Sequence, residues 1–96
     1  MITHIVLYRL KDPTDENRAA LDEKFLSMRG KIPMLRTIEA GTDVVRSERS
    51  YDVALVCTFD NVRGLDAYRE HPVHLPIMEY VRGVVERSHS VDFESR

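Results

Sequence analysis

Two segments of the sequence alternate in the manner of β-strands and carry apolar side chains on both of their faces. Residues 2–10 place Val6 and Tyr8 on one face and Ile5 and Leu7 on the other. Residues 51–59 repeat the pattern, with Val53, Leu55, Cys57 and Phe59 on one face and Ala54 and Val56 on the other. Successive side chains of a strand point to opposite faces, so each of these strands needs cover on both sides.

The remaining elements follow from helical spacing and from the positions of glycine and proline. Leu21, Phe25 and Met28 recur at steps of four and three residues, which predicts an amphipathic helix that ends near Gly30. Pro72 separates two further helices, because a proline cannot continue the hydrogen bonding of a helix interior. In chain order we predict a strand at 2–10, a helix at 15–29, strands at 34–42 and 51–59, helices at 62–71 and 73–86, and a strand at 87–94.

This order predicts an α+β protein with a ferredoxin-like βαββαβ fold, in which one face of a four-stranded antiparallel sheet carries all the helices. We expect residues 1–96 to form a single domain. With helices on one face only, the other face would expose Ile5, Leu7, Ala54 and Val56 as a large apolar patch. A second copy of the chain, packed face to face, would cover this patch, so we predict an obligate homodimer through the open sheet face.

Composition excludes several classes of partner. Fourteen basic and sixteen acidic side chains are interleaved along the chain and give a net charge of −2, which argues against a nucleic-acid-binding surface. No apolar run approaches the ~20 residues that a membrane-spanning helix needs, so we expect no membrane partner. The N-terminal residues do not resemble a secretory signal, and Cys57 is the only cysteine. We therefore expect a soluble cytoplasmic protein.

The side chains best suited to catalysis or ligand binding lie in and around residues 68–80. Helical spacing places His74 on the same face as Ile77 and Val81, so its imidazole should point toward the sheet. Tyr68 shares a helical face with Leu65 and should also point inward.

His4 alternates with Val6 and Tyr8 on one face of the first strand. If that face looks toward the helices, His4, Tyr68 and His74 converge on one pocket between sheet and helices. We expect the apolar lining of this pocket to come from Phe25, Leu55, Met78 and Val81.

Three interpretations of this constellation remain open. A histidine beside a tyrosine can remove a proton from a carbon next to a carbonyl while the phenol stabilises the developing oxyanion. The same groups can form a buried polar network that only braces the corner at Pro72, or they can bind a small apolar or carbonyl ligand without turnover. His71 and His74 form a His-x-x-His pair, but no third ligand stands at a suitable spacing, so we expect no metal site and no cofactor. Cys57 should be buried and inert.

The sequence resembles the Dabb family, the stress-responsive dimeric α/β-barrel domain, over nearly its whole length. The most specific match is the Tyr-x-x-His-Pro-x-His element that begins at Tyr68. The matching segments are residues 4–11, 31–33, 51–56, 67–74 and 91–93. The resemblance implies a ferredoxin-like monomer whose sheet pairs with that of a second copy to form a dimeric α/β barrel.

The resemblance also implies a candidate activity. One plant branch of the family is similar to polyketide cyclases, which close a ring by an aldol-type reaction with a histidine, a tyrosine and no cofactor. The matching positions in this sequence are Tyr68, His74 and His4. A further histidine of that branch, on the third strand, is replaced here by Val53.

Overall fold

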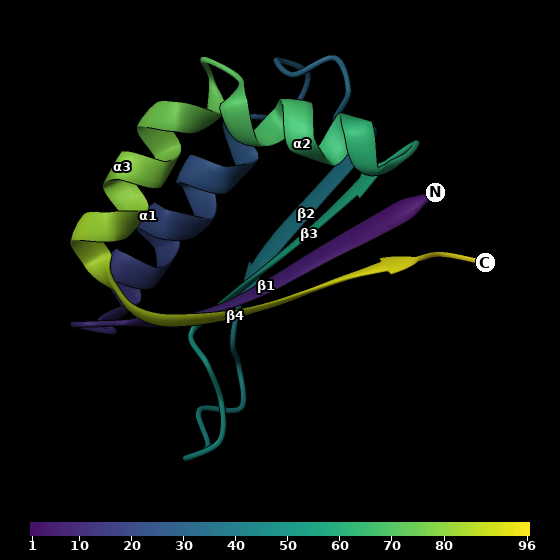
Figure 1. The fold of residues 1–96 in the computed structure, drawn as a ribbon. Helices are drawn as coiled ribbons and strands as arrows, with labels where there is room; N and C mark the ends of the chain where they lie inside the picture. The colour runs from purple at the N-terminus through teal and green to yellow at the C-terminus, as the bar shows by residue number, and fades with distance from the viewer.

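The computed structural model describes residues 1–96 as a four-stranded antiparallel sheet with three helices on one of its faces (Figure 1). The strand order is β2-β3-β1-β4, and the ferredoxin-like βαββαβ arrangement predicted above is confirmed. The elements are β1 (Ile2–Leu10), α1 (Asp15–Leu26), β2 (Thr37–Thr42), β3 (Val53–Phe59), α2 (Val62–Glu70), α3 (His74–Val84) and β4 (Val85–Glu94). None of the three helices is long and apolar enough to cross a lipid bilayer.

Local hydrogen bonds explain where the first two helices begin and end. The Thr14 hydroxyl accepts a hydrogen bond from the backbone N–H of Asn17 at 3.1 Å and caps α1. The Asn61 side chain caps α2 in the same way, through the N–H of Gly64 at 3.0 Å. The first helix ends at Leu26, three residues earlier than predicted, because the chain then turns and Gly30 adopts a positive φ of 76°.

Three strand boundaries also differ from the prediction, one of them the start of β3 at Val53 rather than at residue 51. The second strand begins at Thr37 rather than at residue 34, because the preceding residues form a turn in which Leu35 donates a backbone hydrogen bond to Ile32. The last strand begins at Val85, two residues early and directly after α3. Pairing of Val85 with Leu10 of β1 draws this residue out of the helix.

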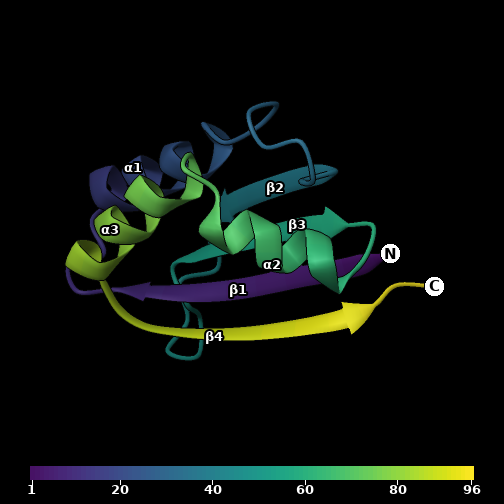
Figure 2. The ribbon, with the colours of Figure 1, turned by 45° about the horizontal axis from the view of Figure 1, so that its top comes forward.

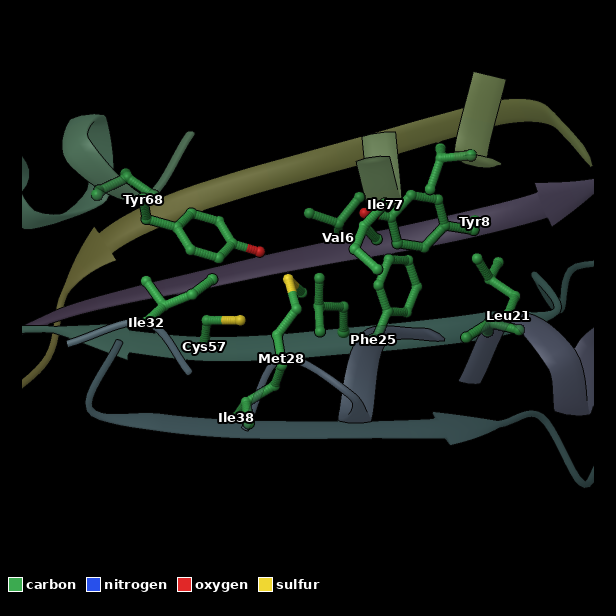
Figure 3. Close-up of a cluster of buried hydrophobic side chains, with 14 of the residues drawn as sticks. Val6, Tyr8, Leu21, Phe25, Met28, Ile32, Ile38, Cys57, Tyr68 and Ile77 are labelled. Carbon is green, nitrogen blue, oxygen red and sulfur yellow. The ribbon is translucent and has the colours of Figure 1, made fainter. Parts of the chain in front are cut away.

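The core lies between the helices and the covered face of the sheet (Figure 3). Leu21, Phe25 and Met28 of the first helical segment are all buried, as their spacing predicts. Val62 lies three residues before Leu65, a spacing that predicts an inward position, but it is 56% exposed because it is the first residue of α2.

No helix covers the opposite face of the sheet. Ile5 lies in the middle of this face, flanked by Val56 on β3 and by Val91 on β4. Leu7, Val91 and Phe93 are 42%, 53% and 45% exposed on this face. The chain therefore presents an apolar sheet face to its surroundings, and the prediction of an open apolar face is confirmed for the protomer.

Candidate functional site

A cavity of about 360 Å³ lies between the covered face of the sheet and helices α2 and α3. Its walls come from β1, β3, β4 and all three helices, and β4 forms the sheet edge that no helix covers (Figure 2). All seven residues that the sequence indicated for a site line this cavity: His4, Phe25, Leu55, Tyr68, His74, Met78 and Val81. Five further lining residues were not singled out from the sequence: Val6, Tyr8, Arg69, Ser88 and Ser90.

The corner at Pro72 brings two of these side chains into contact. The backbone N–H of His71 bonds to the Tyr68 carbonyl and ends α2. The N–H of His74 then bonds to the His71 carbonyl at 2.9 Å, which starts α3 at His74 itself. The rings of Tyr68 and His74 consequently lie against each other, with centroids 4.3 Å apart.

Hydrogen bonding assigns the tautomer of His74. Its Nδ1 lies 3.1 Å from the backbone carbonyl oxygen of Arg69. A carbonyl oxygen can only accept, so Nδ1 carries the proton and Nε2 of the neutral ring keeps its lone pair. Burial of the ring lowers the pKa of His74; the hydrogen bond to the Arg69 carbonyl raises it in part, and the charges of His4 and Arg69 lower it again. His74 is therefore a neutral base near pH 7.

Tyr68 is the neutral donor of the site. The residue is 1% exposed, and Figure 3 shows its ring reaching from α2 with the hydroxyl directed into the layer between helices and sheet. Burial raises the pKa of Tyr68, and the neighbouring Cys57 thiol raises it further. The hydroxyl has the Cys57 thiol as its side-chain hydrogen-bond partner and forms no hydrogen bond with a protein oxygen or nitrogen.

His4 enters the site from β1 with a carboxylate behind it. Its Nδ1 lies 2.5 Å from Oδ1 of Asp92, which is its direct partner on β4. The carboxylate accepts from Nδ1–H, so Nε2 is the ring nitrogen without a partner in the protein. The His4 and Tyr68 rings are 6.3 Å apart, edge to face. Together with His74, the cavity thus contains two imidazoles around one phenol.

The other histidines and the cysteine lie outside the cavity. His71 braces the corner, since its Nδ1 accepts from the Val73 N–H at 3.1 Å. His89 is exposed on the open face against Tyr51, because no helix covers that face of the edge strand β4. Cys57 is fully buried, and burial raises the pKa of its thiol to about 12. No three His, Cys, Asp or Glu side chains gather as a set of metal ligands.

A larger hollow, of about 420 Å³, lies on the open sheet face. It is lined by residues such as Leu7, Ala54 and Val56, and it contains none of the imidazoles. Because it is part of an uncovered sheet surface, we regard it as a contact surface, and the smaller cavity as the candidate functional site.

Comparison with known proteins gives the fold clear relatives. A dimeric ferredoxin-like protein of unknown function from Bacteroides fragilis is 28% identical, with a TM-score of 0.84 over 98% of this chain and 95% of that one. A dimeric ferredoxin-like protein of unknown function from Thermobifida fusca is 25% identical, with a TM-score of 0.85 over 98% and 90%. A hydroxynitrile lyase from Passiflora edulis shares the fold alone, at 16% identity and a TM-score of 0.83 over 99% and 93%.

A search of curated proteins found no match. The family model of the stress-responsive A/B barrel domain, Dabb, matches residues 2–95. That span includes every strand and helix and all the residues that line the cavity. The resemblance inferred from the Tyr-x-x-His-Pro-x-His element is therefore confirmed, and the chain belongs to the Dabb family.

Proposed function

We propose that the chain is a homodimeric Dabb protein that binds a small, largely apolar ligand in the cavity of each protomer. The observation that carries the ligand proposal is the composition of the cavity: a mostly apolar body, with two imidazoles, the Tyr68 phenol and Arg69 at one end. Its volume of about 360 Å³ falls at the lower end of the range for small-molecule sites, so the ligand is small.

The homodimer rests on the open sheet face. Large apolar side chains stand exposed there on the edge strand β4 and on its neighbour β1. The related proteins from Bacteroides fragilis and Thermobifida fusca are dimeric, and a face-to-face pair of sheets would bury these side chains. A molecular mass of one chain in sedimentation equilibrium at micromolar concentration would contradict this part of the proposal.

The ligand proposal can be tested by filling the cavity. Val81→Phe adds a ring to a lining residue of α3, whereas Leu75→Phe makes a similar change at a residue that is 53% exposed on the same helix. We expect a neutral ketone such as acetophenone to bind the wild type and Leu75→Phe in calorimetric titrations, and not Val81→Phe. Unchanged binding to Val81→Phe would place the ligand elsewhere and overturn the proposal.

A second candidate function, cofactor-independent acid/base catalysis on a carbonyl compound, is supported by the tautomer of His74. The free Nε2 of a neutral, buried imidazole can take a proton from the carbon next to a carbonyl, and the Tyr68 hydroxyl can donate to the enolate oxygen. In D₂O, the protein should then speed the exchange of the methyl protons of acetophenone, as followed by proton NMR.

His74→Gln should abolish this exchange, and Tyr68→Phe should reduce it. His71→Gln serves as the control, because His71 lies outside the cavity. Exchange no faster than in buffer, with ketone binding intact, would reject catalysis and leave the binding function standing.

A further inference from the structure

One lining residue gives the cavity its charge. Apart from the two histidines and two tyrosines, Arg69 is the only ionisable residue of the lining, and no carboxylate lines the cavity. A guanidinium is protonated at every physiological pH, so Arg69 brings a permanent positive charge to the polar end of the cavity, where Asp66 and Asp92 each lie 3.7 Å from it.

The donors of Arg69 are not used by the protein. Its Nη1 lies 3.7 Å from Asp66 and its Nη2 lies 3.7 Å from Asp92, and both distances exceed that of a hydrogen bond. The side chain is 50% exposed and donates no hydrogen bond to any other group. Its two acidic neighbours hold the guanidinium in place and leave its N–H groups free for a ligand.

A second free donor lies on the adjacent strand. Ser90 lines the cavity, and its hydroxyl has no hydrogen-bond partner in the protein. It stands two residues before Asp92 on the same face of β4, a separation of about 7 Å along a strand. Because Asp92 lies beside Arg69, the hydroxyl and the guanidinium can reach one ligand head group between them.

The rest of the cavity is mostly apolar, with Ser88 beside Tyr8, and extends along β1. Tyr8 lies four residues after His4, about 13 Å along the strand, and its ring contacts that of Phe25 at a centroid distance of 4.9 Å. The charged end and the aromatic end are therefore separated by roughly the length of a small amphipathic molecule.

We propose that the polar end of the cavity is a carboxylate subsite and that the ligand is a small apolar monocarboxylate. The carboxylate binds Arg69 and Ser90, and the apolar body extends toward Tyr8 and Phe25. One guanidinium balances one negative charge, and its planar fork matches the two oxygens of a carboxylate. Asp92 has one oxygen bonded to His4 and the other 3.7 Å from Nη2 of Arg69, so the ligand's carboxylate competes with Asp92 for the guanidinium. This inference rests on the ligand-binding function proposed above.

Phenylacetate and phenylacetamide are suitable probes, because they differ in charge and hardly in shape. Calorimetric titration of the wild type should show that phenylacetate binds about tenfold more tightly than phenylacetamide, as expected for one charge-assisted pair. Arg69→Gln should remove this advantage by weakening the acid alone. Arg82→Gln is the matched control: Arg82 also forms an ion pair with an acidic residue three positions earlier, but it lies outside the cavity.

The outcomes separate this inference from the function on which it rests. Equal affinities for the two probes in the wild type, or an acid preference that persists in Arg69→Gln, would overturn the carboxylate subsite and leave ligand binding intact. If neither probe nor acetophenone binds the wild type, the subsite and the binding function fail together. Arg69→Lys keeps the positive charge but lacks the planar guanidinium that can donate two parallel hydrogen bonds. An affinity of Arg69→Lys for phenylacetate between those of the wild type and Arg69→Gln supports recognition by the guanidinium.

Discussion

The two faces of the sheet are built from the same strands but differ in where their polar side chains lie and in what covers them. The covered face of β1 carries His4 among apolar neighbours, under helices that add Tyr68, His74 and Arg69 to one end of a cavity. On the open face, the middle of the sheet is formed by Ile5 and its neighbours, with Glu39 beside Val56 and the exposed His89 beside Leu7. Polar groups enclosed by a protomer's own helices can be positioned for a ligand, whereas an exposed apolar face needs another protein surface.

The most disruptive test of this contrast is a charge in the middle of the open face. Val56 pairs with Ile5, so Val56→Asp would place a carboxylate at the centre of each partner's buried surface. In a two-fold symmetric dimer the substitution acts twice, and an unpaired buried charge costs several kcal/mol. We expect sedimentation equilibrium to show a monomer at concentrations where the wild type is a dimer.

Val62→Asp is the control for this variant, since Val62 is exposed on the helix layer. It should remain dimeric. If Val56→Asp still dimerises, the interface lies on another surface of the molecule, and the open face is not the dimer contact.

On the covered face, two substitutions of Tyr68 distinguish the contribution of its ring to packing from the contribution of its hydroxyl. Its ring is buried against Phe59 and His74, with centroids 5.0 Å and 4.3 Å away, so Tyr68→Ala should lower the free energy of unfolding by about 3–5 kcal/mol. Tyr68→Phe keeps the ring and removes a hydroxyl with no oxygen or nitrogen partner, and should cost less than about 1 kcal/mol.

Urea unfolding monitored by circular dichroism can compare the two variants. A loss of more than about 2 kcal/mol in Tyr68→Phe would mean that the hydroxyl braces the corner, because that is the cost of removing a buried hydrogen-bond partner. That outcome would favour a structural role over one in binding or catalysis.

A smaller effect should appear in the pH dependence of stability. Burial lowers the pKa of His74 in the folded protein, so below the unfolded value of 6.5 the unfolded chain binds more protons than the folded one. Above about pH 7, His74 should therefore not reduce the free energy of unfolding. As the pH drops from there toward the lowered pKa, the free energy of unfolding should fall.

The variants His74→Gln and His89→Gln make the comparison between the two faces. His74→Gln should flatten the decline in unfolding free energy between pH 7.5 and pH 5.5, as measured in urea. His89→Gln should leave the decline unchanged, because His89 is exposed on the open face. Equal slopes for the wild type and His74→Gln would show that His74 is not held neutral by burial.

The sequence predicts much of the fold and much of the cavity, for reasons of periodicity. Alternation placed His4 on the inward face of β1, and helical spacing turned Tyr68 and His74 toward it. The structure brings these side chains together around one cavity. Their roles in binding or catalysis stay predictions.

Other features depend on tertiary contacts that periodicity does not record. Arg69 and Ser90 follow the pattern of surface residues, and only the uncovered edge strand makes them part of a cavity wall. The start of β4 at Val85 reflects pairing with Leu10, which is 75 positions away in the sequence. The tautomer of His74 depends on a carbonyl whose position is fixed by the corner at Pro72.

Methyl NMR with phenylacetate tests the central claim most directly, because both faces of the sheet carry methyl groups. On titration, we predict chemical-shift changes at Leu55, Met78 and Val81, which line the cavity. The methyl groups of Leu7 and Val91 on the open face should not shift. Shifts at the open face, or none at the cavity, would contradict the assignment of the ligand to the cavity and of the open face to a second copy of the chain.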